Sequence, residues 1–165
     1  MRPFFTPALS RSALPNRHLS MRTRPLPVRI ALTVLVTAHL AISVLHGVAH
    51  EQAHVPLTLA ASLLVYIVIL AGPMFGLAMT FVAPRTGAWI VAATMAAAFV
   101  FGLVNHFLLD SPDHVAHVNP DGRRLFALTA LLLAMTEALA VAVALRIAWR
   151  REPSRALWLS SGGGV

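Results

Sequence analysis

Histidines gathered in two short windows give this sequence its clearest chemical signal. The chain contains eight histidines. Six of them lie in the two windows: His46, His50 and His54, and then His106, His114 and His117. An imidazole can bind a metal ion or move a proton near neutral pH. Because the chain contains no cysteine, thiolate metal sites, thiol nucleophiles and disulfides are excluded.

The first window has the spacing of one helical face. His46, His50 and His54 are four residues apart, so a continuous helix would carry them as one stripe. His39 lies seven residues before His46 and falls on nearly the same face. Two histidines four residues apart on a helix can hold one metal ion between them. This window therefore predicts metal ligands on a single helix.

The second window combines imidazoles with a carboxylate. His106 and Asp110 are also four residues apart, and would share a helix face. The Ser-Pro-Asp sequence at 111–113 is typical of a helix start, with the serine as cap and the proline in the first turn. It predicts a short helix that carries His114 and His117. Imidazole and carboxylate ligands without sulfur suit Zn, Fe, Ni, Cu(II) or Mn.

The elements that must position these side chains are four long apolar spans. Hydrophobic residues make up 58% of the 165 residues and charged residues 12%, which is about half the usual share in a soluble protein. A membrane helix needs about 20 mostly apolar residues. Four stretches meet this requirement, at about 28–50, 57–82, 88–110 and 125–149. With short links between them, they predict an all-α integral membrane protein, an antiparallel bundle of four transmembrane helices.

The remaining segments divide the chain into three parts. Residues 1–27 are rich in proline and arginine and predict a disordered arm, residues 28–150 form the transmembrane domain, and residues 151–165 predict a flexible tail. Met21 could begin a shorter reading frame. A cleaved signal peptide is an alternative for the first span, but that span is long and ends without a small-residue cleavage site. We therefore expect it to be kept as a membrane helix.

The arginines predict the orientation of the bundle. The formal net charge is +7, and all thirteen basic residues are arginine. If the N-terminus is cytoplasmic, only Arg123 and Arg124 lie outside, and the other eleven lie inside. The asymmetry predicts a multi-pass protein with both termini cytoplasmic, in the inner membrane of a bacterium. Its partner is then the lipid bilayer rather than a nucleic acid.

This topology places both histidine windows at the outer face. The first window ends the first span and the second window ends the third, so His46 or His50 should approach His106 or Asp110. The composite site predicted for a metal ion consists of His46, His50, His54, His106, Asp110, His114 and His117. His46 and His106 lie inside the apolar layer, where they could instead be the two axial ligands of a b-type haem.

A second polar pair is expected deeper in the bundle. Glu137 lies about 18 Å from the inner end of its span, and His39 lies about 15 Å from the inner end of the first span, at 1.5 Å per residue. An ionisable residue at this depth is costly and is a candidate for function. We expect Glu137 either to pair with His39 or to be neutral and bonded to a backbone carbonyl or to Thr136.

Three functions remain open at this point. The favoured hypothesis is a small membrane protein that binds a transition-metal ion or haem b through its histidines. The alternative is a non-catalytic subunit or scaffold without a cofactor, as a homo-oligomer or within a larger membrane complex. Less favoured is a metal-dependent membrane hydrolase, in which a metal-bound water would attack the substrate.

Overall fold

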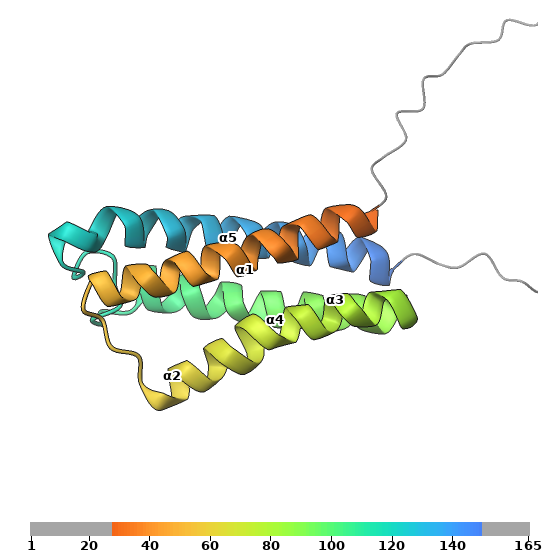
Figure 1. Ribbon diagram of the computed structural model, residues 1–165, viewed down its shortest axis with the longest axis horizontal. Coiled ribbons are helices and arrows are strands. Elements are labelled where there is room, and N and C mark those ends of the chain that lie inside the picture. Colours follow the sequence, from red (N-terminus) through yellow and green to blue (C-terminus); the bar gives the residue numbers. More distant parts are fainter. Residues whose placement is uncertain (1–27, 150–165) are drawn as a thin grey trace, which may run out of the picture.

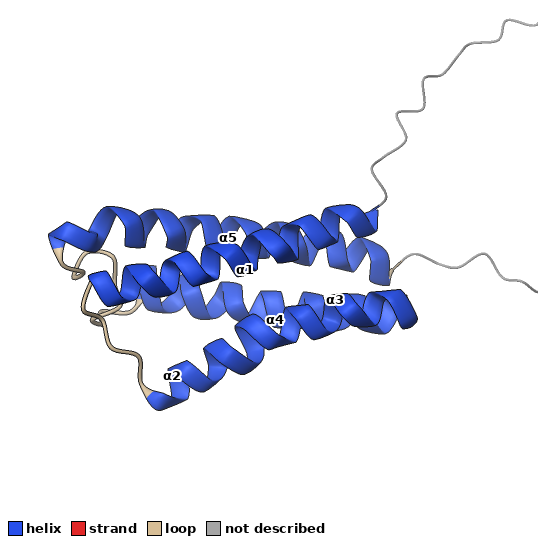
Figure 2. Ribbon diagram, viewed as in Figure 1, coloured by secondary structure: helices blue, strands red, loops and turns tan. Residues whose placement is uncertain are grey.

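The computed structural model describes residues 28–149, and this part of the chain is helical with no strand (Figure 2). Its elements, in chain order, are α1 (Val28–Gln52), α2 (Leu59–Leu64), η1 (Val65–Ala71), α3 (Gly72–Val82), α4 (Pro84–Leu103), η2 (Val104–Leu108) and α5 (Pro120–Ala148). The two η segments are π-helical turns that continue the α-helices beside them. The expected arm at 1–27 and tail at 151–165 lie outside the described residues.

Four of these helical stretches are long and apolar enough to cross a membrane, as the hydropathy predicts: Val28–Gln52, Leu59–Val82, Pro84–Leu108 and Pro120–Ala148. Helix α5 packs against both α1 and α4, and α3 packs against α4 (Figure 1). The short helix α2 diverges from the bundle and buries none of its residues. Both ends of the described chain lie at one end of the bundle, opposite the α1–α2 and η2–α5 loops.

Two of the helices begin earlier than hydropathy alone suggests, and each begins at a proline. Helix α4 starts at Pro84 and α5 starts at Pro120. Proline suits the first turn of a helix, because its missing N–H would have no partner there. Asn119 completes the start of α5, since its side chain accepts a hydrogen bond from the Asp121 N–H at 3.2 Å.

A third proline, Pro73, follows the π-helical turn η1 and changes the hydrogen bonding of its backbone. In an α-helix, the carbonyl of Ile69 would accept from the N–H of residue 73, but residue 73 is a proline and has no N–H. Instead, this carbonyl accepts a hydrogen bond from His39 Nε2 at 3.1 Å. Pro73 therefore leaves a backbone acceptor for a histidine in the bundle interior, which is how proline is tolerated in membrane helices.

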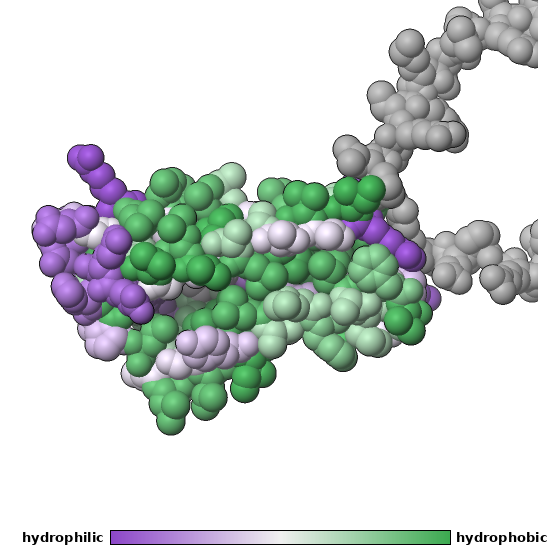
Figure 3. Space-filling view, viewed as in Figure 1, coloured by the Kyte–Doolittle hydropathy of each residue, from purple (hydrophilic) through white to green (hydrophobic). Residues whose placement is uncertain are grey.

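The core has two apolar parts. One part, nearer the end where the described chain starts and finishes, is centred on Leu32, Val91 and Met95. The other is centred on Phe126 and Val118 and lies at the opposite end, under the loops. Large apolar side chains also cover the outside of the bundle, while hydrophilic residues gather at the loop end (Figure 3). An apolar exterior between hydrophilic ends is typical of a bundle that lies in lipid.

Helices α3 and α4 approach each other closely at Gly87. A Cβ atom at Gly87 would lie 2.3 Å from the Thr80 backbone nitrogen and 2.6 Å from the Gly76 carbonyl oxygen. Only glycine allows the two backbones to come this close, as small residues do at contacts between membrane helices.

Candidate metal centre

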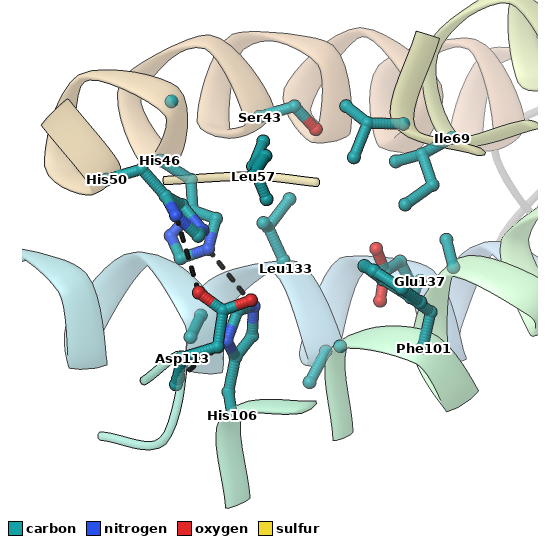
Figure 4. A pocket seen from close by; sticks show the side chains of 16 residues that line it. Ser43, His46, His50, Leu57, Ile69, Phe101, His106, Asp113, Leu133 and Glu137 are labelled. Carbon is teal, nitrogen blue, oxygen red and sulfur yellow. Dashed lines mark hydrogen bonds and ion pairs between the residues drawn. The ribbon is translucent and has the colours of Figure 1, made fainter. Parts of the chain in front are cut away.

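Three buried histidines from two helices meet at the loop end of the bundle (Figure 4). His46 and His50 lie one turn apart on α1, and His106 lies on η2. One ring nitrogen from each of the three lies within 4.8 Å of the others. His46 Nε2 and His106 Nε2 are only 3.2 Å apart. We call these three residues the histidine trio.

The proton positions on two of these rings follow from their neighbours. The Thr129 hydroxyl oxygen lies 2.7 Å from both the Leu125 carbonyl oxygen and His46 Nδ1, and when it donates its proton to the carbonyl it accepts a hydrogen bond from His46 Nδ1. His106 Nδ1 lies 3.2 Å from the Asp113 carbonyl, which can only accept. In this arrangement both neutral rings carry their proton on Nδ1 and a lone pair on Nε2.

Two Nε2 lone pairs thus face each other at 3.2 Å. Two acceptors cannot form a hydrogen bond, so this arrangement is stable only with a cation between them, either a proton or a metal ion. Metal-binding histidines usually present one nitrogen to the metal and donate the other N–H to an acceptor. Two nitrogens that bind one zinc ion at about 2.05 Å in tetrahedral geometry lie about 3.3 Å apart. The observed separation fits that value.

The third histidine lies beside an unsatisfied carboxylate. His50 Nδ1 is 3.5 Å from the Val55 carbonyl and 3.6 Å from Asp113 Oδ1. Asp113 Oδ1 is buried and has no hydrogen-bond partner. A buried carboxylate oxygen without a partner is costly. A cation held by the histidine trio would supply the missing charge.

The π-helical turn η2 brings Asp113 to this position. The Leu109 N–H donates to the Val104 carbonyl, five residues back, and this bond closes the helix. The loop then folds back over the site, because the Val115 N–H donates to the His106 carbonyl at 3.0 Å. Residues 109–119 form turns, so the short helix expected after Ser111 is wrong. The hydrogen bonds of the loop to His106 replace those of a helix.

The other candidate ligands lie outside the trio. Helix α1 ends at Gln52, and His54 is exposed with a positive φ of 55°, so it leaves the stripe of His46 and His50. His117 Nδ1 lies 3.3 Å from Asp110 Oδ1 at the surface, where the Asp110 side chain is 91% exposed. His114 Nδ1 accepts from the Ala116 N–H at 3.1 Å. The structure thus brings together His46, His50 and His106, and adds Asp113 and Thr129, which the sequence analysis did not select.

The trio does not fit a b-type haem. A porphyrin would have to lie flat between two axial nitrogens, but His46 Nε2 and His106 Nε2 are 3.2 Å apart. The neighbouring space is also filled. The His50 ring lies 4.8 Å from that of His46, and Phe126 packs against all three imidazoles with ring centroids 4.9 to 5.1 Å away.

The predicted pair of His39 and Glu137 lies deeper in the bundle. His39 Nδ1 is 3.5 Å from Glu137 Oε1, and both side chains are buried. A mostly apolar cavity of about 90 Å³ extends from the histidine trio to Glu137 (Figure 4). Leu133 lines it between the two sites, and Phe101 lines it beside Glu137. The two polar groups predicted separately from the sequence are therefore connected inside the bundle.

Comparison of the chain with protein-family models, with curated proteins and with solved structures finds no match. The described residues form an all-helical protein with four helices long and apolar enough to cross a membrane and a buried histidine trio that could hold a metal ion.

Proposed function

We propose that this chain is a membrane protein that binds one divalent transition-metal ion through His46, His50 and His106. One observation carries the proposal, namely the facing lone pairs of two buried imidazoles at 3.2 Å. A protein interior does not bury such a repulsive contact without a cation to relieve it. The Thr129 hydroxyl and the Asp113 carbonyl fix the ring protons on the side away from the metal.

Zinc is the ion that fits the ligands best. Three imidazoles and one carboxylate are borderline and hard ligands, which suit Zn²⁺, whereas Cu(I) prefers thiolates and thioethers. We assign Asp113 as the source of negative charge next to the ion, since its Oδ1 is buried without a partner. Whether the fourth position is taken by this oxygen or by water, three histidine ligands are sufficient for a zinc site.

We further propose that the four helices cross a bilayer with the trio at the outer face. The apolar exterior and the eleven-to-two arginine asymmetry both support this placement. The inner membrane of a bacterium is the compartment we expect. The site would then lie at the membrane surface that first meets extracytoplasmic metal ions.

The metal content of protein purified in detergent tests the proposal. We expect one zinc ion per chain in the natural protein after zinc loading and removal of excess ion. His46→Ala, His50→Ala and His106→Ala should each lose it, because the loss of one ligand usually breaks such a site. His117→Ala is the matched control, since His117 is exposed at the same end of the bundle. Equal zinc content in all four variants, or none in the natural protein, would contradict the proposal.

A second pair of variants separates the two carboxylates of the loop. Asp113→Asn should weaken zinc binding about 10- to 100-fold, the usual effect of losing a group that supports a metal ligand. Asp110→Asn should leave the affinity unchanged, because the Asp110 side chain points into solvent. The reverse order would show that Asp110, as the helical spacing suggests, is the carboxylate at the metal.

A further inference from the structure

His39 and Glu137 together form a site for one proton. His39 Nε2 lies 3.1 Å from the Ile69 carbonyl and must donate to it, so only Nδ1 is left to face Glu137. Nδ1 is fully buried and lies 3.5 Å from Glu137 Oε1 without another partner. Two satisfied states exist: a neutral imidazole with a protonated carboxyl, or an imidazolium with a carboxylate. Each state holds one proton between the two atoms and has no net charge.

No other titratable group adjoins Glu137 among the described residues. Helix α1 contributes His39, with the Ser43 hydroxyl on the cavity wall. The cavity wall next to Glu137 is otherwise apolar, formed by Ile69 of η1 and by Ala98 and Phe101 of α4. Across the cavity, the titratable groups are the histidine trio and Asp113. Glu137 lies about 12 Å along α5 from Thr129, at 1.5 Å per residue, so it acts on the trio through charge rather than contact.

Two negative charges nearby would neutralise a divalent cation at the trio. The three imidazoles are neutral when they bind a metal, so they supply none. Asp113 supplies one. The other acidic side chains of the described residues, Glu51, Asp110 and Asp121, are exposed to solvent. Glu137 is therefore the second carboxyl group that faces the cavity, and it is available only if the His39–Glu137 pair gives up its proton.

We propose that the protein exchanges protons for metal, and that Glu137 releases its proton when a divalent ion binds to the trio. The inference rests on the proposed metal site and deepens it. In the metal-free protein of this proposal, the shared proton is on the Glu137 carboxyl and the His39 imidazole is neutral. When the ion enters with two positive charges, the O–H bond of this carboxyl breaks and the proton leaves to bulk water. The cavity then contains the ion with the carboxylates of Asp113 and Glu137, and its net charge is zero.

Counting the protons released per zinc ion tests this exchange. Zinc is added to weakly buffered, detergent-purified protein with a pH indicator, and bound zinc is measured in the same sample. Glu137→Gln should bind zinc through the trio but release one proton fewer per ion than the natural protein. Glu51→Gln is the matched control and should release the natural number, because Glu51 is exposed. Any protons lost by the trio itself are common to all three proteins and cancel.

Equal proton release from the natural protein and Glu137→Gln, with zinc bound in both, would overturn the exchange and leave the metal site intact. If the natural protein binds no zinc, the metal site itself fails. If Glu137→Gln does not fold, infrared difference spectra replace it. The carbonyl band of a protonated carboxyl group should disappear when zinc binds to Asp113→Asn and to Glu51→Gln, which assigns the band to Glu137. Zinc binding without loss of this band would also overturn the exchange.

Discussion

Replacing Thr129 by valine tests whether the ring protons are fixed for metal binding. Valine has nearly the shape of threonine but lacks the oxygen that accepts the 2.7 Å hydrogen bond from His46 Nδ1. Without this acceptor, the His46 proton can move to Nε2 and be donated to the lone pair of His106 Nε2 at 3.2 Å. The metal-free protein then gains a new hydrogen bond in the position that the metal must occupy.

The expected magnitude follows from that exchange of hydrogen bonds. The new His46–His106 bond stabilises the metal-free state by about 0.5 to 1.5 kcal/mol, and metal binding must break it. The bound state also keeps a buried Nδ1–H without an acceptor, at a cost of about 1 to 3 kcal/mol. Together these costs are about 1.5 to 4.5 kcal/mol. Since about 1.4 kcal/mol is a tenfold change in affinity, we expect zinc to bind about 10- to 1000-fold more weakly. The unfolding free energy of the metal-free protein should change little.

Competition for zinc with a coloured chelator measures this affinity directly. Thr136→Val is the matched control on the same helix. The Thr136 hydroxyl also donates to backbone carbonyls of its own helix, at 2.9 and 3.0 Å, but it forms no hydrogen bond with a histidine among the described residues. Equal zinc affinities of the Thr129→Val and Thr136→Val variants would refute the hydrogen bond that His46 Nδ1 donates to Thr129. They would also refute the conclusion that His46 presents an Nε2 lone pair to the metal ion.

Two further predictions concern topology and packing. The chain has no cysteine, so a single introduced cysteine reports its own position. A Ser111→Cys variant should react with an impermeant thiol reagent in intact cells, whereas Ser10→Cys should react only after the membrane is permeabilised. Labelling of Ser10→Cys in intact cells would contradict the proposed orientation. Gly87→Ala should lower the unfolding free energy in detergent by about 1 to 3 kcal/mol, because its Cβ would overlap the backbone of α3. Gly47→Ala, with no atom within 4 Å of the new Cβ, should not destabilise the protein, and an equal loss in both variants would contradict the close packing of α3 and α4.

Hydropathy was sufficient to predict the number of helices and the end of the bundle where the histidines meet. Each span is long and apolar enough to be recognised alone, and an antiparallel order then brings the end of the first span to that of the third. The approach of His46 and His50 to His106 follows from this order, and the structure confirms it. The depth of Glu137 and His39 along their helices likewise follows from a rise of 1.5 Å per residue.

The detailed composition of the site depends on departures from regular helix geometry. Spacing by four residues favours Asp110 as the partner of His106, but the Leu109 N–H bonds to Val104 in a π-helical turn and ends the helix. The chain then folds back, so that Asp113 reaches the trio through its carbonyl and its carboxylate. A similar departure at Pro73 frees the Ile69 carbonyl for His39. At both polar sites of this bundle, a π-helical segment contributes to a histidine's environment, and π-helical turns are often found at functional sites.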